Sequence, residues 1–331
     1  MRAIRQRRFG GPDTLRVEEV PEPRPGTGAL RIVVEAAGVH LLDTTLRKGG
    51  DGPFGSVALP ATPGREVSGR VDAVGPGVDS SWLGKRVVAH LGDAGGGYAE
   101  LAIAIAERTH VIPDELDADA AVAMIGTGSA AAAVLEATPI CAGDIVMVTA
   151  AAGGVGHLLV QSVVQKGAHV IAAVGGPAKV DLIQKADLIR HLGAHSVVDY
   201  RHEEWVQHVV ELLDGRNLNV VLDGVGGQIG RAALELLSPG GWLTLFGWSS
   251  GTVTPLTADD LFARGVTATA AVGARVVVRR DGMRPLERAA LDAAAAGRWR
   301  PLTTRFPLED AATAHAALEN RRTVGKVVLT P

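Results

Sequence analysis

The chain has 331 residues and a formal net charge of −3, with 47% hydrophobic and 21% charged residues. This length allows two domains that each bury a core, and the balanced charge argues against a nucleic-acid-binding or polybasic membrane protein. Glycine is frequent, at 42 residues, whereas Cys141 is the single cysteine, which excludes an intramolecular disulfide and any multi-cysteine metal site.

The N-terminal segment is basic and runs into Gly10-Gly11-Pro12 rather than into an apolar stretch. A secretory signal is therefore not expected. No unbroken apolar run approaches the roughly 18 residues of a membrane span. We expect a cytoplasmic protein without a membrane or nucleic-acid partner.

The first third of the chain is predicted to be an all-β unit. Short alternating or apolar segments, separated by glycine and proline, are typical of strands; they cover residues 15–20, 30–37, 67–74 and 86–90. Four glycines lie within or just before residues 65–78. They favour a tight β-ribbon in which two backbones approach closely.

The pattern changes after residue 115. Residues 119–137 are rich in alanine and predict a helix that Gly126 and Gly128 interrupt. Alternating strands and helices follow, which indicates a parallel sheet with crossover helices. The expected strands of this sheet are 144–149, 169–174, 196–199, 220–223 and 242–246, and the expected helices are 154–166, 178–192, 205–213 and 230–237. The last segment of the chain is expected to hold the helices 286–296 and 311–319 and a terminal strand, 326–329. Within the helix over 178–192, residues 180–183 nearly repeat as 186–189, with an effect that the sequence leaves open.

The segment 144–156 carries the strongest motif. A buried strand runs into a glycine-rich turn and then directly into a helix, with Ala151, Gly153 and Gly156 at the three positions of the dinucleotide fingerprint. Backbone amides at the start of a helix bind phosphate oxygens; here they belong to Gly154, Val155 and Gly156. We therefore predict a dinucleotide site.

The end of the second predicted strand distinguishes NADPH from NADH. An NAD site usually places Asp or Glu there to bind the ribose 2′-hydroxyl. This chain has Val174 and Gly175, followed by Lys179, which can offer a cation to a 2′-phosphate. Alternatively, Lys179 is a solvent-exposed helix residue that binds no ligand. The pattern favours NADPH.

Six ordered segments resemble the medium-chain dehydrogenase/reductase superfamily, in its zinc-free NADPH:quinone oxidoreductase (zeta-crystallin-like) branch. They are residues 38–43 (GVHLLD), 63–66 (PGRE), 97–100 (GYAE), 151–156 (AAGGVG), 223–227 (DGVGG) and 325–329 (GKVVL). The resemblance covers essentially the whole chain. It implies a GroES-like β-rich catalytic domain (1–120 and 276–331), a Rossmann doubly wound parallel-sheet NADPH domain (121–275), and an active site in the cleft between them.

The resemblance also implies site residues and a homodimer. Lys179, Tyr200 and Arg321 match positions that hold the 2′-phosphate, and relatives pair through the segment that is here 265–272. The full set expected to bind the cofactor is Ser129, Ala152, Gly153, Gly154, Val155, Gly156, Gly175, Lys179, Tyr200, Val225, Phe246, Gly247 and Arg321.

No metal is expected. Zinc alcohol dehydrogenases use Cys where this chain has His40 and His where it has Arg65, and a zinc site normally needs three protein ligands. Without a Lewis acid, oxidation of simple alcohols is disfavoured. The expected reaction is hydride transfer from NADPH to a small-molecule quinone or α,β-unsaturated carbonyl.

The proton donor is less well defined. Relatives have a Tyr shortly after the position of Asp43 that this chain lacks, so His40, which titrates near neutrality, is the nearest candidate. A hydrogen-bonded structural histidine and protonation by solvent are the alternatives. The small residues Thr127, Gly128 and Ala131 predict room for a bulky substrate beside the nicotinamide.

Two other functions stay open at this point. One is an enoyl reductase acting on a CoA or carrier-protein thioester, although no basic cluster for its phosphates stands out. The other is a non-catalytic nucleotide-binding or RNA-binding protein, which the missing Tyr allows and the negative net charge disfavours.

Overall fold

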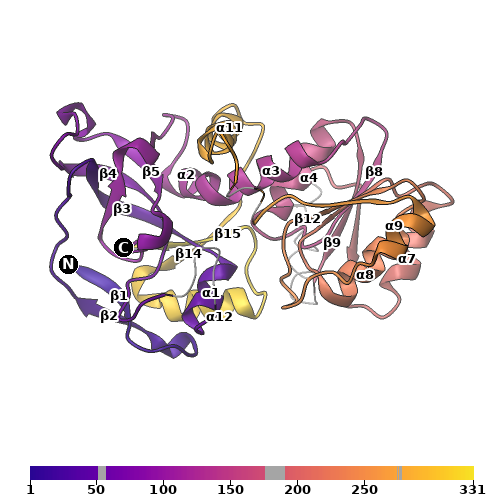
Figure 1. The fold of residues 1–331 in the computed structure, drawn as a ribbon, viewed down its shortest axis with the longest axis horizontal. Helices are drawn as coiled ribbons and strands as arrows, with labels where there is room; N and C mark the ends of the chain where they lie inside the picture. The colour runs from indigo at the N-terminus through magenta and orange to yellow at the C-terminus, as the bar shows by residue number, and fades with distance from the viewer. Residues whose placement is uncertain (51–56, 176–190, 274, 276–277) are drawn as a thin grey trace. The chain divides into compact units, whose positions relative to one another are not determined.

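The computed structural model describes residues 1–50, 57–175, 191–273, 275 and 278–331. The chain divides into two compact units (Figure 1). The first unit comprises Met1–Ser129 and Glu287–Pro331, and the second comprises Ala130–Leu286. Both ends of the chain therefore build one unit, and the middle builds the other.

The first unit is built on a seven-stranded sheet. Its strand order is β14-β15-β3-β4-β5-β7, with β6 paired to β3. The long strands β3 (Ala29–Val39) and β4 (Glu66–Val74) form the centre, and β15 (Lys326–Thr330) pairs antiparallel with β3. The other strands are β5 (Arg86–His90), β6 (Leu101–Ile105), β7 (Thr109–Val111) and β14 (Thr303–Pro307), while β1 (Arg2–Gln6) and β2 (Leu15–Glu19) form a separate two-stranded sheet.

Glycines allow the strand β4 to lie close to its neighbours. A Cβ at Gly69 would be 1.9 Å from the carbonyl oxygen of Val33, and one at Gly75 would be 1.8 Å from that of Gly26. No side chain fits at such distances, so the expected close backbone approach is present. The segment is a central strand that pairs with both β3 and β5, not an isolated ribbon.

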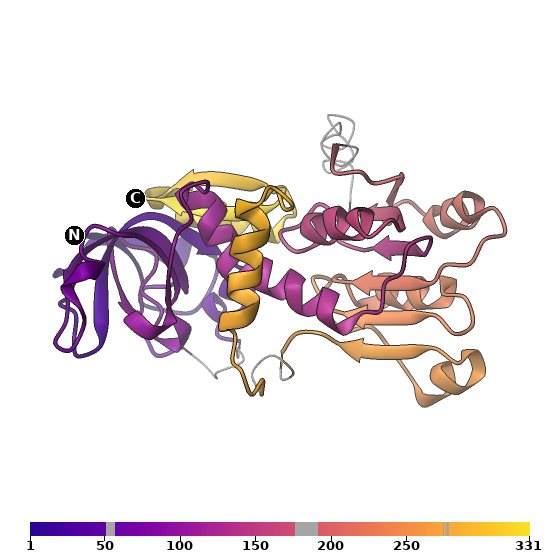
Figure 2. The same ribbon diagram turned by 90° about the horizontal axis from the view of Figure 1, so that it is seen from above.

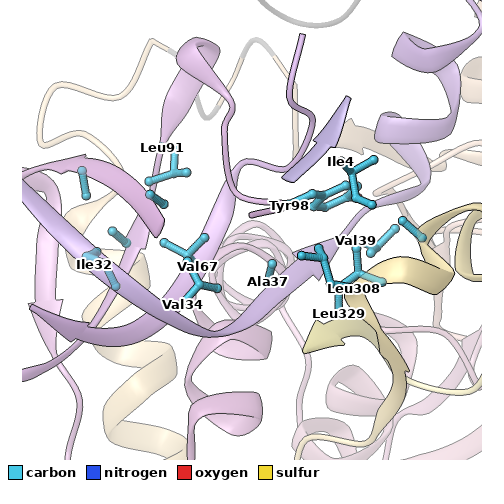
Figure 3. Close-up of a cluster of buried hydrophobic side chains, with 14 of the residues drawn as sticks. Ile4, Ile32, Val34, Ala37, Val39, Val67, Leu91, Tyr98, Leu308 and Leu329 are labelled. Carbon is cyan, nitrogen blue, oxygen red and sulfur yellow. The ribbon is translucent and has the colours of Figure 1, made fainter. Parts of the chain in front are cut away.

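The larger apolar cluster of this unit lies inside the curved sheet (Figure 3). Strands from both ends of the chain contribute to it, together with the 3₁₀ turn η6 (Leu308–Asp310). Ten of its buried side chains are labelled in the figure: Ile4, Ile32, Val34, Ala37, Val39, Val67, Leu91, Tyr98, Leu308 and Leu329.

A chain of buried polar groups joins the helices α1 (Leu41–Arg47) and α12 (Ala311–Glu319). Arg47 Nη1 lies 3.2 Å from Nδ1 of His315, whose Nε2 lies 3.1 Å from the hydroxyl of Tyr98. That hydroxyl donates to Asp43 Oδ2 at 3.2 Å. Because a guanidinium only donates, Nδ1 of His315 is the acceptor and Nε2 carries the hydrogen.

A continuous helical stretch runs from α2 (Ala118–Ala123) through the π-helical turn η5 (Met124–Gly128) to α3 (Ser129–Ala137). The predicted interruption at Gly126 and Gly128 is this π turn. By length and composition alone the stretch could cross a membrane, but 67% of its most apolar window is buried inside the structure, as is typical of a core helix.

Within the first unit, helix α11 (Arg284–Ala295) packs against the π turn η5 at Gly128 (Figure 2). A Cβ at Gly128 would be 2.8 Å from Cβ of Ala290 and 2.9 Å from Sδ of Met124. The room for a bulky substrate that we expected beside Gly128 is therefore filled, and that expectation is wrong at this position. Glycine is needed there for helix packing.

The second unit is a six-stranded parallel sheet in the order β10-β9-β8-β11-β12-β13. Numbered along the chain this is the order 3-2-1-4-5-6 of the doubly wound dinucleotide fold, which confirms the predicted fold class. The strands are β8 (Ile145–Val148), β9 (His169–Val174), β10 (Ser196–Asp199), β11 (Val220–Asp223), β12 (Trp242–Leu245) and β13 (Thr267–Ala270), and the helices are α4 (Gly156–Gln165), α7 (Trp205–Leu213), α8 (Gly227–Leu236) and α9 (Ala258–Arg264).

The borders between the units lie farther along the chain than the sequence suggested. They fall after Ser129 and after Leu286 rather than after residues 120 and 275, because each lies inside a helical stretch that continues across it. The expected helix over 178–192 and its near-duplication lie mostly outside the described residues.

The buried His315 makes the stability of the first unit sensitive to acid. Burial lowers its pKa to about 4, against about 6.5 in an unfolded chain. The unfolded state therefore binds more protons, and the stabilisation that is complete above pH about 6.5 is lost as the pH falls toward 4. By linkage the loss at pH 5 is about 2 kcal/mol.

We expect His315→Gln to lower stability at pH 7 and to shrink the decrease between pH 7 and pH 5. Urea denaturation of both proteins at the two pH values measures this. Burial also lowers the pKa of His157 to about 4, so the variant should keep the part of the decrease in stability that comes from His157. The exposed His191 supplies the control His191→Gln. An unaltered pH dependence in His315→Gln would contradict the prediction.

Candidate functional site

The glycine-rich turn after β8 is shaped by the carbonyl group of Ala150. Ala150 has a left-handed backbone (φ 50°), and its oxygen accepts a hydrogen bond of 2.8 Å from the amide of Gly153. A Cβ at Gly156 would lie 2.2 Å from the same oxygen, so only glycine fits there. Gly153, Gly154 and Val155 are partly exposed between the buried Ala152 and Gly156.

The turn leads straight into α4, where the amide of His157 already donates to the carbonyl oxygen of Gly153 at 3.2 Å, so a phosphate group would meet the amides that precede it. Partly exposed backbone at the start of a helix is suited to bind a phosphate group. His157 braces it from the buried side, because its Nδ1 lies 2.9 Å from the carbonyl oxygen of Gly153. Burial lowers the pKa of His157 to about 4, so the ring is neutral at pH 7 and donates Nδ1–H.

β8 and β11 are adjacent strands whose chain connections run in opposite directions, the point at which doubly wound sheets bind ligands. Asp223 ends β11 and is fully buried. Its Oδ1 accepts from the hydroxyl of Thr149 at 2.6 Å and from the amide of Val225 at 2.9 Å, and its Oδ2 accepts from Thr254 at 2.6 Å and from the amide of Gly226 at 3.2 Å. The carboxylate thus sets the conformation of the loop 223–227.

Aromatic side chains cover two glycines at this edge of the sheet. A Cβ at Gly224 would lie 2.3 Å from Phe246, and a Cβ at Gly175 would lie 2.3 Å from the hydroxyl of Tyr200. Gly247 lies less close to Gly224, because a Cβ at Gly247 would be 3.1 Å from the carbonyl oxygen of Gly224. Val225 and Tyr200 are buried.

The structure therefore gathers most of the expected cofactor residues of the second unit at the carboxyl ends of its strands. Two of the other expected residues lie in the first unit. The buried Ser129 donates its hydroxyl to the carbonyl oxygen of Gly126 at 2.8 Å, and Arg321 follows α12 with a left-handed backbone (φ 56°). Lys179 lies outside the described residues. The role of each in cofactor binding stays a prediction.

In the first unit, His40 belongs to a cluster that the sequence did not predict. Nε2 of His40 lies 2.6 Å from Oε1 of Glu66 and 2.8 Å from Nζ of Lys326, and Nζ donates to Oε2 of Glu66 at 2.8 Å. Glu66 and Lys326 are buried, whereas 26% of the His40 side chain is exposed. His40 is thus the member of the cluster that solvent reaches.

Two glycines make room for the carboxylate of Glu66. A Cβ at Gly126 would lie 1.6 Å from Oε1, and a Cβ at Gly38 would lie 2.5 Å from Oε2. Gly126 lies in the π turn η5, a kind of irregularity that is frequent at functional sites. Burial raises the pKa of Glu66, but the nearby charges of His40 and Lys326 outweigh it and hold the pKa well below its usual range.

Asp43 holds the start of α1 in place. It accepts a hydrogen bond of 2.7 Å from the amide of His40 and one from the hydroxyl of Tyr98, and it lies 3.6 Å from Nε of Arg65. These contacts use Asp43 to position the backbone of His40, in line with the orienting role that the sequence suggested.

The residues of this cluster do not fit a zinc ion of the alcohol dehydrogenase type. Such a site needs three neutral or anionic ligands. Here the second ligand position is the cationic Arg65, and the carboxylate of Glu66 is already paired with Lys326.

Two family descriptions match the chain: Alcohol dehydrogenase GroES-like domain over residues 26–114, and Zinc-binding dehydrogenase over residues 192–329. A 2-haloacrylate reductase from Burkholderia sp is 32% identical, over 97% of this chain and 96% of that protein. A quinone oxidoreductase from Pseudomonas aeruginosa is also 32% identical, over 98% of this chain and 97% of that protein.

Solved structures give the same picture. A mycobacterial protein complexed with NADPH superposes with a TM-score of 0.86 at 36% identity. The quinone oxidoreductase of Escherichia coli, also complexed with NADPH, superposes with a TM-score of 0.87 at 28% identity. Each comparison covers 100% of both chains.

We expect Lys326→Met to destabilise the protein by about 3–5 kcal/mol, because it leaves the buried carboxylate of Glu66 without its cation. Adding Glu66→Gln removes the remaining charge and should restore part of the loss. Urea denaturation at pH 7 measures both variants. The exposed Lys166 offers the control Lys166→Met. A double variant no more stable than Lys326→Met alone would contradict this explanation.

Proposed function

Because the chain belongs to the quinone oxidoreductase branch of the medium-chain dehydrogenase/reductase superfamily, we propose that it transfers hydride from NADPH to a quinone or an α,β-unsaturated carbonyl. The observation that carries the proposal is the glycine-rich turn before α4, where no other residue can replace Gly156. This turn follows β8, which lies beside β11 at the point where the strand order of the doubly wound sheet reverses. NADPH supplies the hydride when it is bound.

The end of β9 supports NADPH over NADH. The strand ends at Val174 and is followed by Gly175, with no carboxylate at that point to bind a ribose 2′-hydroxyl or to repel a 2′-phosphate. Tyr200 packs against Gly175 and so lies beside this end of the strand. In the proposal, Lys179, Tyr200 and Arg321 bind the 2′-phosphate.

The loop 223–227 and Phe246 hold the nicotinamide end of the cofactor in this proposal. Asp223 accepts four hydrogen bonds from buried donors, which fixes the backbone that would face the ring. A rigid loop of this kind orients a reactant without an ordering cost at the moment of reaction.

His40 is the proposed proton donor. Hydride addition to a conjugated acceptor leaves an enolate or hydroquinone anion, which then takes a proton. The contacts of Nε2 with the carboxylate of Glu66 and the ammonium group of Lys326 hold the partly exposed ring of His40 in one orientation, from which it gives a proton in this proposal.

The reaction is proposed to be independent of zinc. The cations of Arg65 and Lys326 lie where a divalent ion would meet electrostatic repulsion, and a conjugated acceptor disperses negative charge without a Lewis acid. A cytoplasmic location belongs to the same proposal, supported by the exposed and unpaired Cys141.

A homodimer is the proposed assembly. β13 is the last strand of the parallel sheet, and its outer residues are exposed or half-buried. Phe262 on the preceding α9 is 88% exposed. An uncharged edge strand with a large apolar side chain nearby is suited to pair with a second copy.

The substrate class can be tested by a steady-state screen. We expect kcat/KM to be at least about tenfold higher with NADPH than with NADH, because no carboxylate follows β9, and we expect turnover of 1,4-naphthoquinone or an enone. Faster turnover of crotonyl-CoA would instead identify an enoyl reductase. Tight NADPH binding without turnover of any acceptor would favour the non-catalytic alternative.

We expect His40→Asn to lower kcat for enone reduction by about 10²-fold, a usual contribution of a general acid, with a smaller effect on quinones, whose anions solvent can protonate. KM for NADPH should not change. The adjacent, partly exposed Leu41 provides the control Leu41→Ala. An enone kcat equal to that of the wild type would remove His40 from the mechanism.

The dimer can be tested by adding charge to the sheet edge. Thr267→Lys with Ala270→Lys should yield a monomer of 34.2 kDa, because like charges would face each other across the pairing strands. Light scattering coupled to gel filtration measures the mass, with Gln207→Lys on α7 as the control. A dimer that survives the double substitution would exclude β13 as the interface.

A further inference from the structure

Three exposed side chains come together where the chain leaves the parallel sheet at β10 and enters α7. They are His202, Glu204 and His208, and each offers a ligand atom within 4.8 Å of the other two. The two imidazole rings are stacked, with centroids 5.3 Å apart and planes inclined by 27°. Neither the phosphate turn nor the cluster around His40 uses these residues.

The local backbone holds the group in place. His208 donates its amide to the carbonyl oxygen of Glu204 at 3.0 Å, so these two residues lie one helical turn apart on the same face. The turn before them is closed by hydrogen bonds from His202 to Asp199 and from Trp205 to His202. Trp205 is 6% exposed and belongs to the apolar core, which anchors the turn.

We propose that His202, Glu204 and His208 form a surface binding site for a divalent transition-metal ion of the zinc type. Two imidazole nitrogens and one carboxylate oxygen are ligands that zinc prefers, and three protein ligands with a water molecule complete a tetrahedron. The carboxylate offsets one of the two positive charges, and the exposed Glu203 adds a second negative charge nearby.

One existing contact must be given up for the ion to bind. Nδ1 of His202 accepts a hydrogen bond from the amide of Glu204 at 3.3 Å. An ion bound at Nδ1 would replace that long bond, and an ion bound at Nε2 would require the ring hydrogen to move to Nδ1. Either change is inexpensive at an exposed position, where water can take the amide hydrogen bond.

The ion would cross-link His202, in the connection between β10 and α7, to His208 on the helix. An ion that binds the folded protein more tightly than the unfolded chain raises the melting temperature. The proposal therefore predicts a zinc-dependent gain in thermal stability that does not depend on NADPH or on any substrate.

Calorimetric titration of Zn²⁺ into the Cys141→Ser protein tests the site, since this change removes the exposed thiol as a competing ligand. We expect one ion per chain. His208→Gln in the same background should weaken binding at least about tenfold and abolish the zinc-dependent rise in melting temperature. Gln207→Ala, at the adjacent exposed position on α7, should bind zinc as the parent protein does.

A second readout reports on the ligands directly. Co²⁺ bound by two imidazoles and a carboxylate in a tetrahedral site gives intense visible absorption, which His208→Gln should remove. Because His208 is exposed, circular dichroism should show the variant folded as the parent is. Absence of binding in the parent protein, or equal affinity in His208→Gln, would overturn the proposal.

Discussion

The buried carboxylate of Glu66 is the constraint on which the candidate catalytic end of the first unit depends. An ionised carboxylate without water needs a partner, and here Lys326 and His40 supply the charges. The surrounding structure meets that need: Gly38 and Gly126 leave space for the oxygens, a π turn replaces regular helix at Gly126, and the last strand brings Lys326 beside the central strand β3. The position of His40 is a consequence of this arrangement.

The second unit uses the same principle for a different purpose. Asp223 is as deeply buried as Glu66, but hydroxyl and amide groups rather than cations surround it. The hydrogen bonds of Asp223 determine the conformation of the loop 223–227. The ion pairs of Glu66 instead place opposite charges beside the imidazole ring of His40. In each unit, one fully buried carboxylate therefore organises groups of the candidate site: the backbone of the loop 223–227 or the side chain of His40.

Local sequence patterns predicted most of the fold because they reflect short-range physics. The strands β5, β9, β10 and β11 and the helices α7 and α12 lie where alternation and periodicity indicated. β1, β14 and α1 were missed, since their short polar-rich segments carry no clear period. The phosphate turn was predictable from its glycines. The partners of His40 were not, because Lys326 is 260 residues away from Glu66 in the sequence and only the sheet brings them together.

That separation has a consequence for how the protein is made. β3 and β4 leave the ribosome early, so Glu66, the first residue of β4, is in place long before Lys326 is synthesised. Until β15 adds to the edge of β3, the nascent first unit holds this acid without its lysine and with only His40 beside it. Protonation or local opening must satisfy that acid in the meantime. β15 can pair with β3 only after the intervening parallel-sheet unit has been translated, so vectorial synthesis makes the ion pair between Glu66 and Lys326 a late contact in folding.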